Sequence, residues 1–303
     1  MRICSLLPSA TEIVFALGLG DELVGVSHEC EYPPAARQKP TVIHATLHQG
    51  QLSSLGIDRA VQTSLREHQS LYQVDEELLR RLQPDLIITQ ALCDVCAVNT
   101  AEVAKLAHAL PSRPAVLSLH PHTLIEALED IRRVGDATGH RVQADVLVSA
   151  LHQRLDRVRA LVAKTAHRPR VFCLEWLEPP MASGHWVPEM VEIAGGREIL
   201  GRAGAPSRYV TWQEIADARP EILGLMPCGF SMARTRQELS VVTAQPLWHE
   251  LPAVRSGRVY LVNGPAYFNS SGPRLADGIE LLAGLLHPDV CEALMPCGGA
   301  QVW

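Results

Sequence analysis

The chain has 303 residues, of which 47% are hydrophobic, enough apolar material for one large core or two medium ones. Its net charge of -6 and the absence of any basic run argue against a nucleic acid as the main partner. No apolar stretch is long enough to cross a bilayer, so we expect no membrane insertion.

The N-terminal segment predicts a strand, a helix and a second strand. Ser9 or Thr11 is expected to cap the helix, because either hydroxyl can accept a hydrogen bond from a free backbone N–H of the first turn. Gly18 is expected to end it. The second strand, at residues 23–26, leads into a polar loop at residues 28–30.

Apolar runs and helical segments then alternate along the whole chain, which is typical of an α/β fold. The strands that we expect after the first two lie at residues 84–89, 115–121, 170–176, 221–226 and 258–264. In a parallel sheet the carboxyl ends of the strands share one edge, so the loops that follow them are expected to converge on a single cleft.

Two helical segments separate the two sets of strands. The first begins after Thr123 and is expected to be interrupted at Gly135 and Gly139. The second, residues 141–166, predicts a helix of roughly 40 Å whose apolar face includes Val146. We therefore expect an N-terminal lobe at residues 1–122, a helical backbone at residues 123–167 and a C-terminal lobe at residues 168–303.

The stretch from Cys173 to Gly196 combines acidic, aromatic and histidine residues in what we interpret as a strand-end loop, a pattern typical of a binding surface. The aromatic candidates for ligand contact are Trp176, Trp186, Phe230, Tyr267 and Phe268, and the polar candidates are Ser9, Glu29, Glu175, His185 and Ser271. Their alternative roles are core packing for the aromatic residues and backbone hydrogen bonding for the polar ones.

A second set of residues is suited to a metal ion. The predicted ligands are His28, Cys30, Cys93, Cys96 and Cys228, which would suit zinc, cobalt or an iron–sulfur cluster. Cys93 and Cys96 form a C-x-x-C pair, whose spacing lets two thiolates reach one metal or act as a redox pair. The alternative is two loop cysteines without a ligand.

Four segments, taken in order, resemble one known family. They are SLLPSATEIVFALG with VGVSHECEYPP, LLRRLQPDLII, EPPMASG followed by EIAGG, and YFNSSGPRLADGIELLA. In this order the chain resembles the helical-backbone, or class III, substrate-binding proteins of ABC importers for cobalamin, haem and ferric siderophores, and most closely the cobalamin-binding members. The resemblance implies two Rossmann-like lobes with parallel sheets, joined by one long helix, with the ligand clamped between them.

The resulting hypothesis is a binding protein, not an enzyme, for a small-molecule metal chelate, with cobalamin or a related corrinoid first. The alternative is an enzyme or metal carrier that depends on a metal or an iron–sulfur cluster and uses the Cys, His and Glu residues of the cleft. A third is a cytosolic sensor or scaffold. No nucleophile–base motif, P-loop or G-x-G-x-x-G is present, which favours binding over catalysis.

Residues 1–7 run into the first strand without the features of an export signal, and eight cysteines fit a reducing compartment. We therefore expect a cytoplasmic location, with a periplasmic one as the alternative. Importers of the resembled family recognise one acidic residue on each lobe. By resemblance these positions fall on Glu77 and on Gln213, with Glu214 one residue away, so we expect docking on an ABC permease to be impaired.

Overall fold

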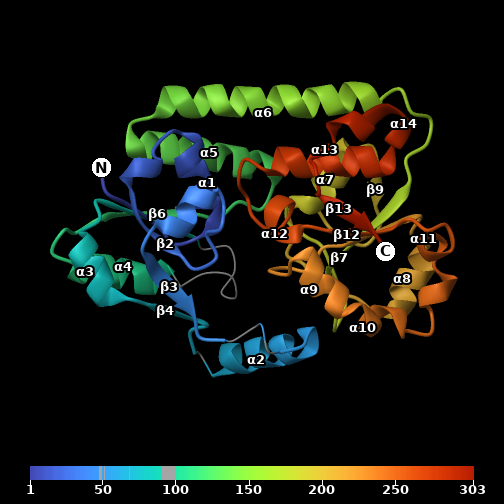
Figure 1. Ribbon diagram of the computed structural model, residues 1–303, viewed down its shortest axis with the longest axis horizontal. Coiled ribbons are helices and arrows are strands. Elements are labelled where there is room, and N and C mark those ends of the chain that lie inside the picture. The colour runs from blue at the N-terminus through green and yellow to red at the C-terminus, as the bar shows by residue number, and fades with distance from the viewer. Residues whose placement is uncertain (48–49, 51, 68, 91–99) are drawn as a thin grey trace. The chain divides into compact units, whose positions relative to one another are not determined.

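Two α/β units make up the part of the chain that the structure describes (Figure 1). This computed structural model describes residues 1–303 except 48–49, 51, 68 and 91–99. Unit 1 comprises Met1–Leu52, Gly56–Pro121 and Ile125–Ser149, and unit 2 comprises Ser53–Leu55, His122–Leu124 and Ala150–Trp303. No helix in the described part of the chain is long and apolar enough to cross a membrane.

Unit 1 contains a six-stranded sheet in the order β4-β3-β2-β1-β5-β6. Its strands are β1 (Ile3–Ser5), β2 (Leu23–Ser27), β3 (Thr41–Ala45), β4 (Tyr72–Val74), β5 (Leu86–Gln90) and β6 (Ala115–Leu119). All neighbouring pairs are parallel except β3 and β4, which are antiparallel. The strand order reverses between β1 and β5, and open α/β sheets bind ligands at the carboxyl edge beside such a reversal.

The helices of unit 1 bury apolar side chains against this sheet. They are α1 (Pro8–Ala16), α3 (Glu76–Leu82), α4 (Thr100–Ala109) and α5 (Leu124–Thr138), and α2 (Ser54–Arg66) begins in the short segment assigned to unit 2. Leu79 of α3 and Val103 of α4 are fully or almost fully buried and join Cys4 and Ile87 in one apolar cluster. Helices α3 and α4 are therefore held against the sheet by apolar packing.

The predicted cap of α1 is wrong. The helix begins at Pro8, its N-cap is Leu7, and no side chain caps it. Pro8 has no N–H and its φ is already helical, so the first turn has fewer free donors to satisfy. Ser9 and Thr11 are instead buried inside the helix.

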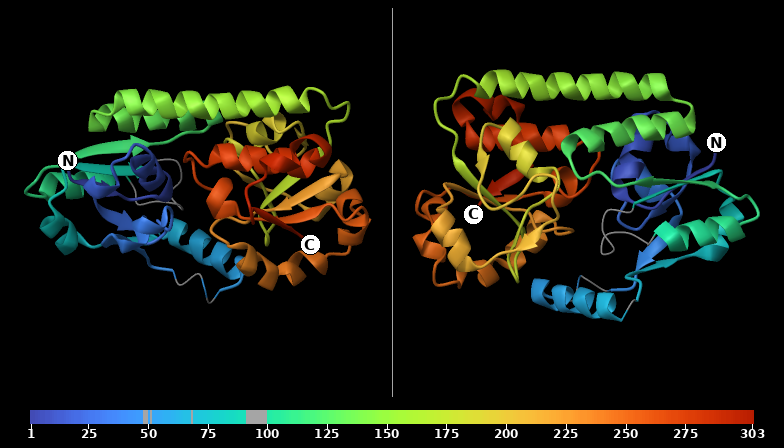
Figure 2. Two further views of the ribbon diagram at one scale, coloured as in Figure 1. Left: turned by 45° about the horizontal axis from the view of Figure 1, so that its top comes forward. Right: turned by 180° about the vertical axis from the view of Figure 1, so that it is seen from behind.

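Helix α5 is continuous through Gly135, contrary to the predicted interruption. It runs to Thr138, and Gly139, with a φ of +74°, ends it. A Cβ on Gly135 would lie 2.6 Å from the Cβ of Ala144. The glycine therefore permits close approach of α5 and α6 (Arg141–Val162), which lie side by side in the right view of Figure 2.

The 22 residues of α6 span about 33 Å and belong partly to unit 1 and partly to unit 2. Its buried face is formed by Ala144, Val148, Leu151, Leu155 and Val158. Val146 is 65% exposed, so its predicted place on that face is wrong. In unit 2, Arg154 of α6 pairs with Asp277 and Glu280, which ties α6 to that unit.

Unit 2 contains a seven-stranded sheet in the order β10-β8-β7-β11-β12-β13, with β9 also paired to β7. Its strands are β7 (Arg170–Trp176), β8 (Met181–Ala182), β9 (Arg197–Glu198), β10 (Arg208–Tyr209), β11 (Ile222–Leu225), β12 (Val259–Val262) and β13 (Ala300–Val302). Strand β11 pairs parallel with β7 and β12, and β9 pairs parallel with β7. The later strands β11 and β12 lie on the other side of β7 from β9, so the order reverses between β7 and β11.

The helices of unit 2 are mostly short. They are α7 (Val187–Ile193), α8 (Trp212–Ala218), α9 (Met232–Gln237), α10 (Leu239–Thr243), α11 (Pro252–Arg255), α12 (Gly264–Tyr267), α13 (Leu275–Leu286) and α14 (Pro288–Cys291). Phe172, Leu223 and Trp248 are buried in its main apolar cluster. The predicted α/β class with two sheets rich in parallel strands is thus confirmed, and the antiparallel strands β4, β8, β10 and β13 are additions that the sequence did not predict.

Candidate functional site

An aromatic pair lies at the carboxyl edge of the unit 2 sheet, beside the reversal of strand order. Trp176 ends β7 and Phe230 follows β11, and their ring centroids are 5.1 Å apart in an edge-to-face contact. The Trp176 indole N–H donates to the carbonyl of Glu178 at 3.1 Å. Trp176 is partly exposed, whereas Phe230 is 2% exposed, so Phe230 supports the tryptophan from within the unit.

A charged layer supports the same pair. The guanidinium of Arg234 lies 5.1 Å from the centroid of the Phe230 ring and pairs with Glu238. Glu238 is buried and also accepts a hydrogen bond from the backbone N–H of Ser54 at 2.8 Å. These contacts fix the Phe230 ring in place, which reduces the entropy that the aromatic pair would lose on binding a ligand.

Glu175 lies within β7, whose bounds are those of the strand predicted at residues 170–176, so it does not belong to the loop that follows. The hydroxyl of Ser207 donates to its carboxylate at 2.7 Å. Burial raises the pKa of Glu175, and the hydrogen bond from Ser207 only partly opposes that effect. The side chain is therefore an acid held near the aromatic pair with a reduced tendency to ionise.

Trp186 and Phe268 are buried, at 5% and 1% exposure. The indole N–H of Trp186 donates to the carbonyl of Phe268 at 2.8 Å. Both rings are thereby occupied in the packing of unit 2, and the hydrogen bond joins α7 to the loop after α12. This arrangement favours a packing role for both residues over direct contact with a ligand.

His185 precedes α7 in a left-handed backbone conformation, with a φ of +50°. Two backbone hydrogen bonds hold it there: the N–H of His185 donates to the carbonyl of Ala205 at 2.7 Å, and its own carbonyl accepts from the N–H of Gly204 at 2.9 Å. Its ring centroid lies 5.8 Å from that of His122. Burial, with a smaller contribution from the charge of His122, lowers the pKa of His185, which favours the neutral imidazole.

The loop after α12 contains the remaining candidates of unit 2. Tyr267 is partly exposed, and the guanidinium of Arg274 lies 6.0 Å from the centroid of its ring. Ser271 is buried at 4% exposure.

In unit 1, Cys30 belongs to a buried chain of hydrogen bonds. The hydroxyl of Thr11 lies 3.1 Å from the Cys30 sulfur and 2.8 Å from the Ser5 hydroxyl, and Ser5 donates to the carbonyl of Leu7 at 2.9 Å. Burial raises the pKa of the Cys30 thiol to about 12. These surroundings favour the protonated thiol.

His28 lies at the carboxyl end of β2, above the edge of the unit 1 sheet. Its Nδ1–H donates to the carbonyl of Ile43 at 3.1 Å, so the lone pair of the neutral ring is on Nε2. Burial lowers the pKa of His28, and His44, whose ring is stacked on it at 6.5 Å, adds to that effect. Glu29 is 37% exposed, and its carboxylate lies 3.9 Å from the His28 Nε2.

The structure does not support the predicted metal cluster. Among the residues that it describes, no group of three or more His, Cys, Asp or Glu side chains is arranged to hold a metal ion. His28 and Cys30 belong to unit 1, and Cys228, which is partly exposed, belongs to unit 2. Cys93 and Cys96 lie outside the described residues.

Three residues were missed by the sequence analysis as members of these groups. His44 and Tyr72 surround His28, and His122 lies against His185. Each is brought to its partner by strand pairing or by the return of the chain to unit 2, neither of which leaves a local pattern in the sequence.

The residues considered for permease docking differ in their surroundings. The Glu77 side chain is 82% exposed and pairs with Arg81 at 3.1 Å on α3. Gln213 donates to Asp217 at 2.9 Å on α8. Glu214 is engaged in a capping box with Thr211 at the start of the same helix.

Residues 3–266 match the family described as "Periplasmic binding protein". The chain belongs to this family. The periplasmic binding protein fold is shared by the periplasmic vitamin B12 binding protein of Vibrio cholerae, with a TM-score of 0.66, 24% identity and coverage of 94% of this chain and 96% of that one. It is also shared by the periplasmic haem-binding protein RhuT of Roseiflexus, with a TM-score of 0.71, 20% identity and coverage of 95% and 98%.

Two relatives of the periplasmic binding protein family are similar in sequence. The vitamin B12-binding protein of Vibrio cholerae is 26% identical over 92% of this chain and 86% of its own length. YvrC of Bacillus subtilis, an uncharacterized ABC transporter substrate-binding lipoprotein, is 27% identical over 95% of this chain and 80% of its own length. The chain therefore has a substrate-binding role of the ABC transporter type.

The expected cytoplasmic location is wrong. The family is one of periplasmic binding proteins, and the relatives include a substrate-binding lipoprotein, so the location is periplasmic or extracellular.

Proposed function

We propose that the chain binds a corrinoid, cobalamin or a close relative, as the substrate-binding protein of an ABC importer. The observation that carries the proposal is the Trp176–Phe230 pair at the carboxyl edge beside the strand-order reversal of unit 2. The similarity to the vitamin B12-binding protein of Vibrio cholerae, over most of both chains, supports the corrinoid as the first ligand to test.

The chemistry of the pair suits a macrocycle with a broad apolar surface. Trp176 offers a large, rigid surface with few rotatable bonds, and Phe230 and Arg234 hold it from behind. In unit 1, the Nε2 lone pair of His28 is of the kind that binds a cobalt or iron ion inside a chelate. Burial raises the pKa of Glu175, which adds a polar group at the neighbouring position of β7.

Fluorescence titration tests this proposal. All five tryptophans of the chain lie in unit 2, so quenching by a bound corrinoid reports on this unit. We expect saturable quenching by hydroxocobalamin with one site per chain. Trp176→Ala should weaken binding by about 1–3 kcal/mol, the usual cost of removing an aromatic contact at the centre of an interface.

Trp212→Ala is the matched control. Trp212 is also partly exposed and also makes an edge-to-face contact, with Trp248 at 6.1 Å, but it begins α8 away from the aromatic pair. It should leave the affinity within about 0.5 kcal/mol of the original. Equal losses in the two variants would show that the effect is structural, and the absence of any saturable quenching would refute the corrinoid proposal.

The partner that we propose is a permease of the ABC type, as the name of YvrC indicates for that relative. Glu77 is the side chain of unit 1 whose exposure suits a contact with a cationic group, although the contact would have to compete with Arg81. On α8, Gln213 donates to the carboxylate of Asp217 one turn later, so Asp217 places a carboxylate beside the second predicted position.

A further inference from the structure

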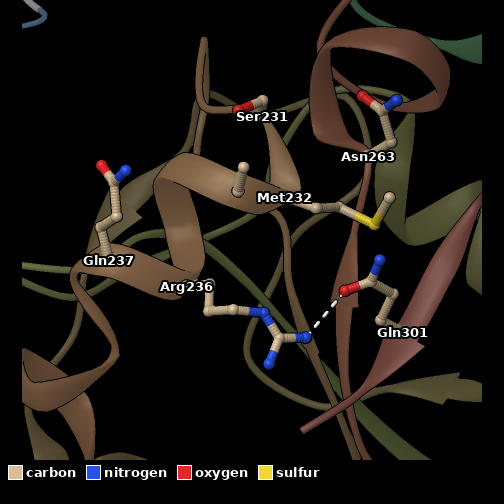
Figure 3. Close-up of a pocket in the computed structure, with 7 residues that line it drawn as sticks. Ser231, Met232, Arg236, Gln237, Asn263 and Gln301 are labelled. Carbon is tan, nitrogen blue, oxygen red and sulfur yellow. Dashed lines mark hydrogen bonds between the residues drawn. The ribbon is translucent and has the colours of Figure 1, made fainter.

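A pocket with several polar side chains in its lining lies in unit 2, beside the aromatic pair. It has a volume of about 760 Å³ and is lined by residues of α9, by Asn263 at the end of β12 and by Gln301 of β13 (Figure 3). Ser231, one of the lining residues, directly follows Phe230 in the sequence. The volume falls within the range of pockets that bind small molecules.

The oxygen atoms of three lining side chains already accept hydrogen bonds. The Ser231 Oγ accepts from the backbone N–H of Arg234 at 3.2 Å, and the Asn263 Oδ1 accepts from that of Ala266 at 3.3 Å. The Gln301 Oε1 accepts from Arg236 at 2.7 Å, the bond drawn as a dashed line in Figure 3. The hydrogen atoms on these groups, namely the Ser231 hydroxyl and the two amide NH₂ groups, are left to donate to something else.

Charge in the pocket has one sign. Among the described residues that line it, Arg236 is the only charged one, and none is acidic. Within the described part of the chain, Arg236 makes no ion pair, and its one side-chain hydrogen bond is the bond to Gln301. That bond orients the guanidinium while leaving other N–H groups of the fork unused.

From this donor-rich lining we propose that the pocket is a second binding site, for a small organic carboxylate. A single guanidinium matches the single charge of a carboxylate group, and the planar fork can bind its two oxygens together. A phosphate dianion concentrates two negative charges on one tetrahedral group, which one planar guanidinium matches less well, whereas the charges of succinate or citrate are spread over separate carboxylate groups. Met232 reaches into the space between Asn263 and Gln301 in Figure 3, and its apolar side chain suits the carbon skeleton of an organic acid.

Calorimetric titration of the full chain with acetate, succinate and citrate, at constant ionic strength, tests the site. We expect saturable binding of at least one of these acids at one site per chain. Arg236→Met should weaken it by about tenfold to a hundredfold, because it removes a charge-assisted hydrogen bond. The neutral analogue succinamide should not bind measurably, and inorganic phosphate should bind more weakly than the best carboxylate.

Arg255→Met is the matched control, since Arg255 is another exposed arginine of unit 2. To the residues that the structure describes it makes one hydrogen bond, to the carbonyl of His249, and no ion pair. It should bind the acids as the original protein does, and thermal melting should show both variants to be folded. The proposal is overturned if no carboxylate binds, if both variants lose binding equally, or if phosphate binds more tightly than the acids. The carboxylate site is argued from other residues than the corrinoid proposal. Binding of hydroxocobalamin by Arg236→Met is measured separately, so that a failure of one proposal can be told from a failure of the other.

Discussion

The hydrogen bonds around Cys30 assign this residue a structural role. Its sulfur is bonded to the Thr11 hydroxyl inside a chain that ends on a backbone carbonyl, and only 3% of the residue is exposed. The same residue looks like a metal ligand in the sequence, because it follows His28 by two positions in a polar loop. Burial, which the sequence does not show, decides between the two roles.

Thiol labelling of the native protein at about pH 8 should therefore spare Cys30. Its pKa of about 12 leaves little thiolate, and burial also blocks access. Cys297 is exposed and serves as the internal comparison. Peptide mass spectrometry after alkylation should show Cys30 reacting at least about 100-fold more slowly than Cys297. Similar rates for the two would contradict the buried hydrogen-bond chain.

Glu175 should make the stability of the protein depend on pH in a specific direction. Its pKa is raised in the folded state, so the folded protein binds its proton more tightly than the unfolded chain does. Its contribution is therefore complete below the ordinary carboxyl pKa and is lost as the pH rises through the raised value. Glu175→Gln should flatten the fall of the unfolding free energy above about pH 5, by up to about 1.4 kcal/mol per pH unit.

Chemical denaturation at a series of pH values measures this effect, and Glu214→Gln is the control of opposite sign. The backbone hydrogen bond from Thr211, followed by Arg208, lowers the pKa of Glu214. Its contribution is present above the ordinary carboxyl pKa and is lost as the pH falls. If Glu175→Gln changed the profile on the acid side only, as we expect for Glu214→Gln, the assignment for Glu175 would be wrong.

At the scale of elements, Gly135 shows how packing overrides local propensity. A glycine in a helical pattern lowers the expected stability of the helix, which is why the sequence predicts a break. In the structure the helix continues, because the missing Cβ lets α5 approach Ala144 of α6. The information lies in a contact between helices and not in the local sequence.

Gly135→Ala should consequently destabilise the protein, although alanine is the better helix former. Overpacking against Ala144 should cost about 1–3 kcal/mol, more than the gain of about 1 kcal/mol in propensity. Denaturant unfolding measures the difference. The double variant Gly135→Ala with Ala144→Gly should recover part of the loss as a favourable coupling energy of about 1 kcal/mol. Additive effects would mean that the two residues do not meet.

The longer parallel strands and most helices could be predicted because their apolar patterns extend over five or more residues, as in β5, β6 and β7. Strands β8, β9 and β10 have two residues each, which is too short to show an alternation of apolar and polar residues. The aromatic pair was predicted as two separate residues, since Trp176 and Phe230 meet only through the pairing of β7 with β11. The burial of Trp186 and its hydrogen bond to the carbonyl of Phe268 could not be predicted from its position in the sequence.

For the whole molecule, membership of the periplasmic binding protein family corrects the cytoplasmic location that was predicted from the sequence. The substrate-binding role follows from the match over residues 3–266. The identity of the substrate depends on side chains, because relatives with the same fold are named for vitamin B12 or for haem. The aromatic pair at the carboxyl edge of the unit 2 sheet is the feature of this chain on which the corrinoid proposal rests.

Native mass spectrometry of the full chain, incubated with equimolar hydroxocobalamin and haemin, compares the two ligands in one sample. We expect a complex that contains one corrinoid per chain, with the visible spectrum of the corrinoid retained after gel filtration. A complex with haemin in preference to the corrinoid, or a chain that emerges with neither, would contradict it.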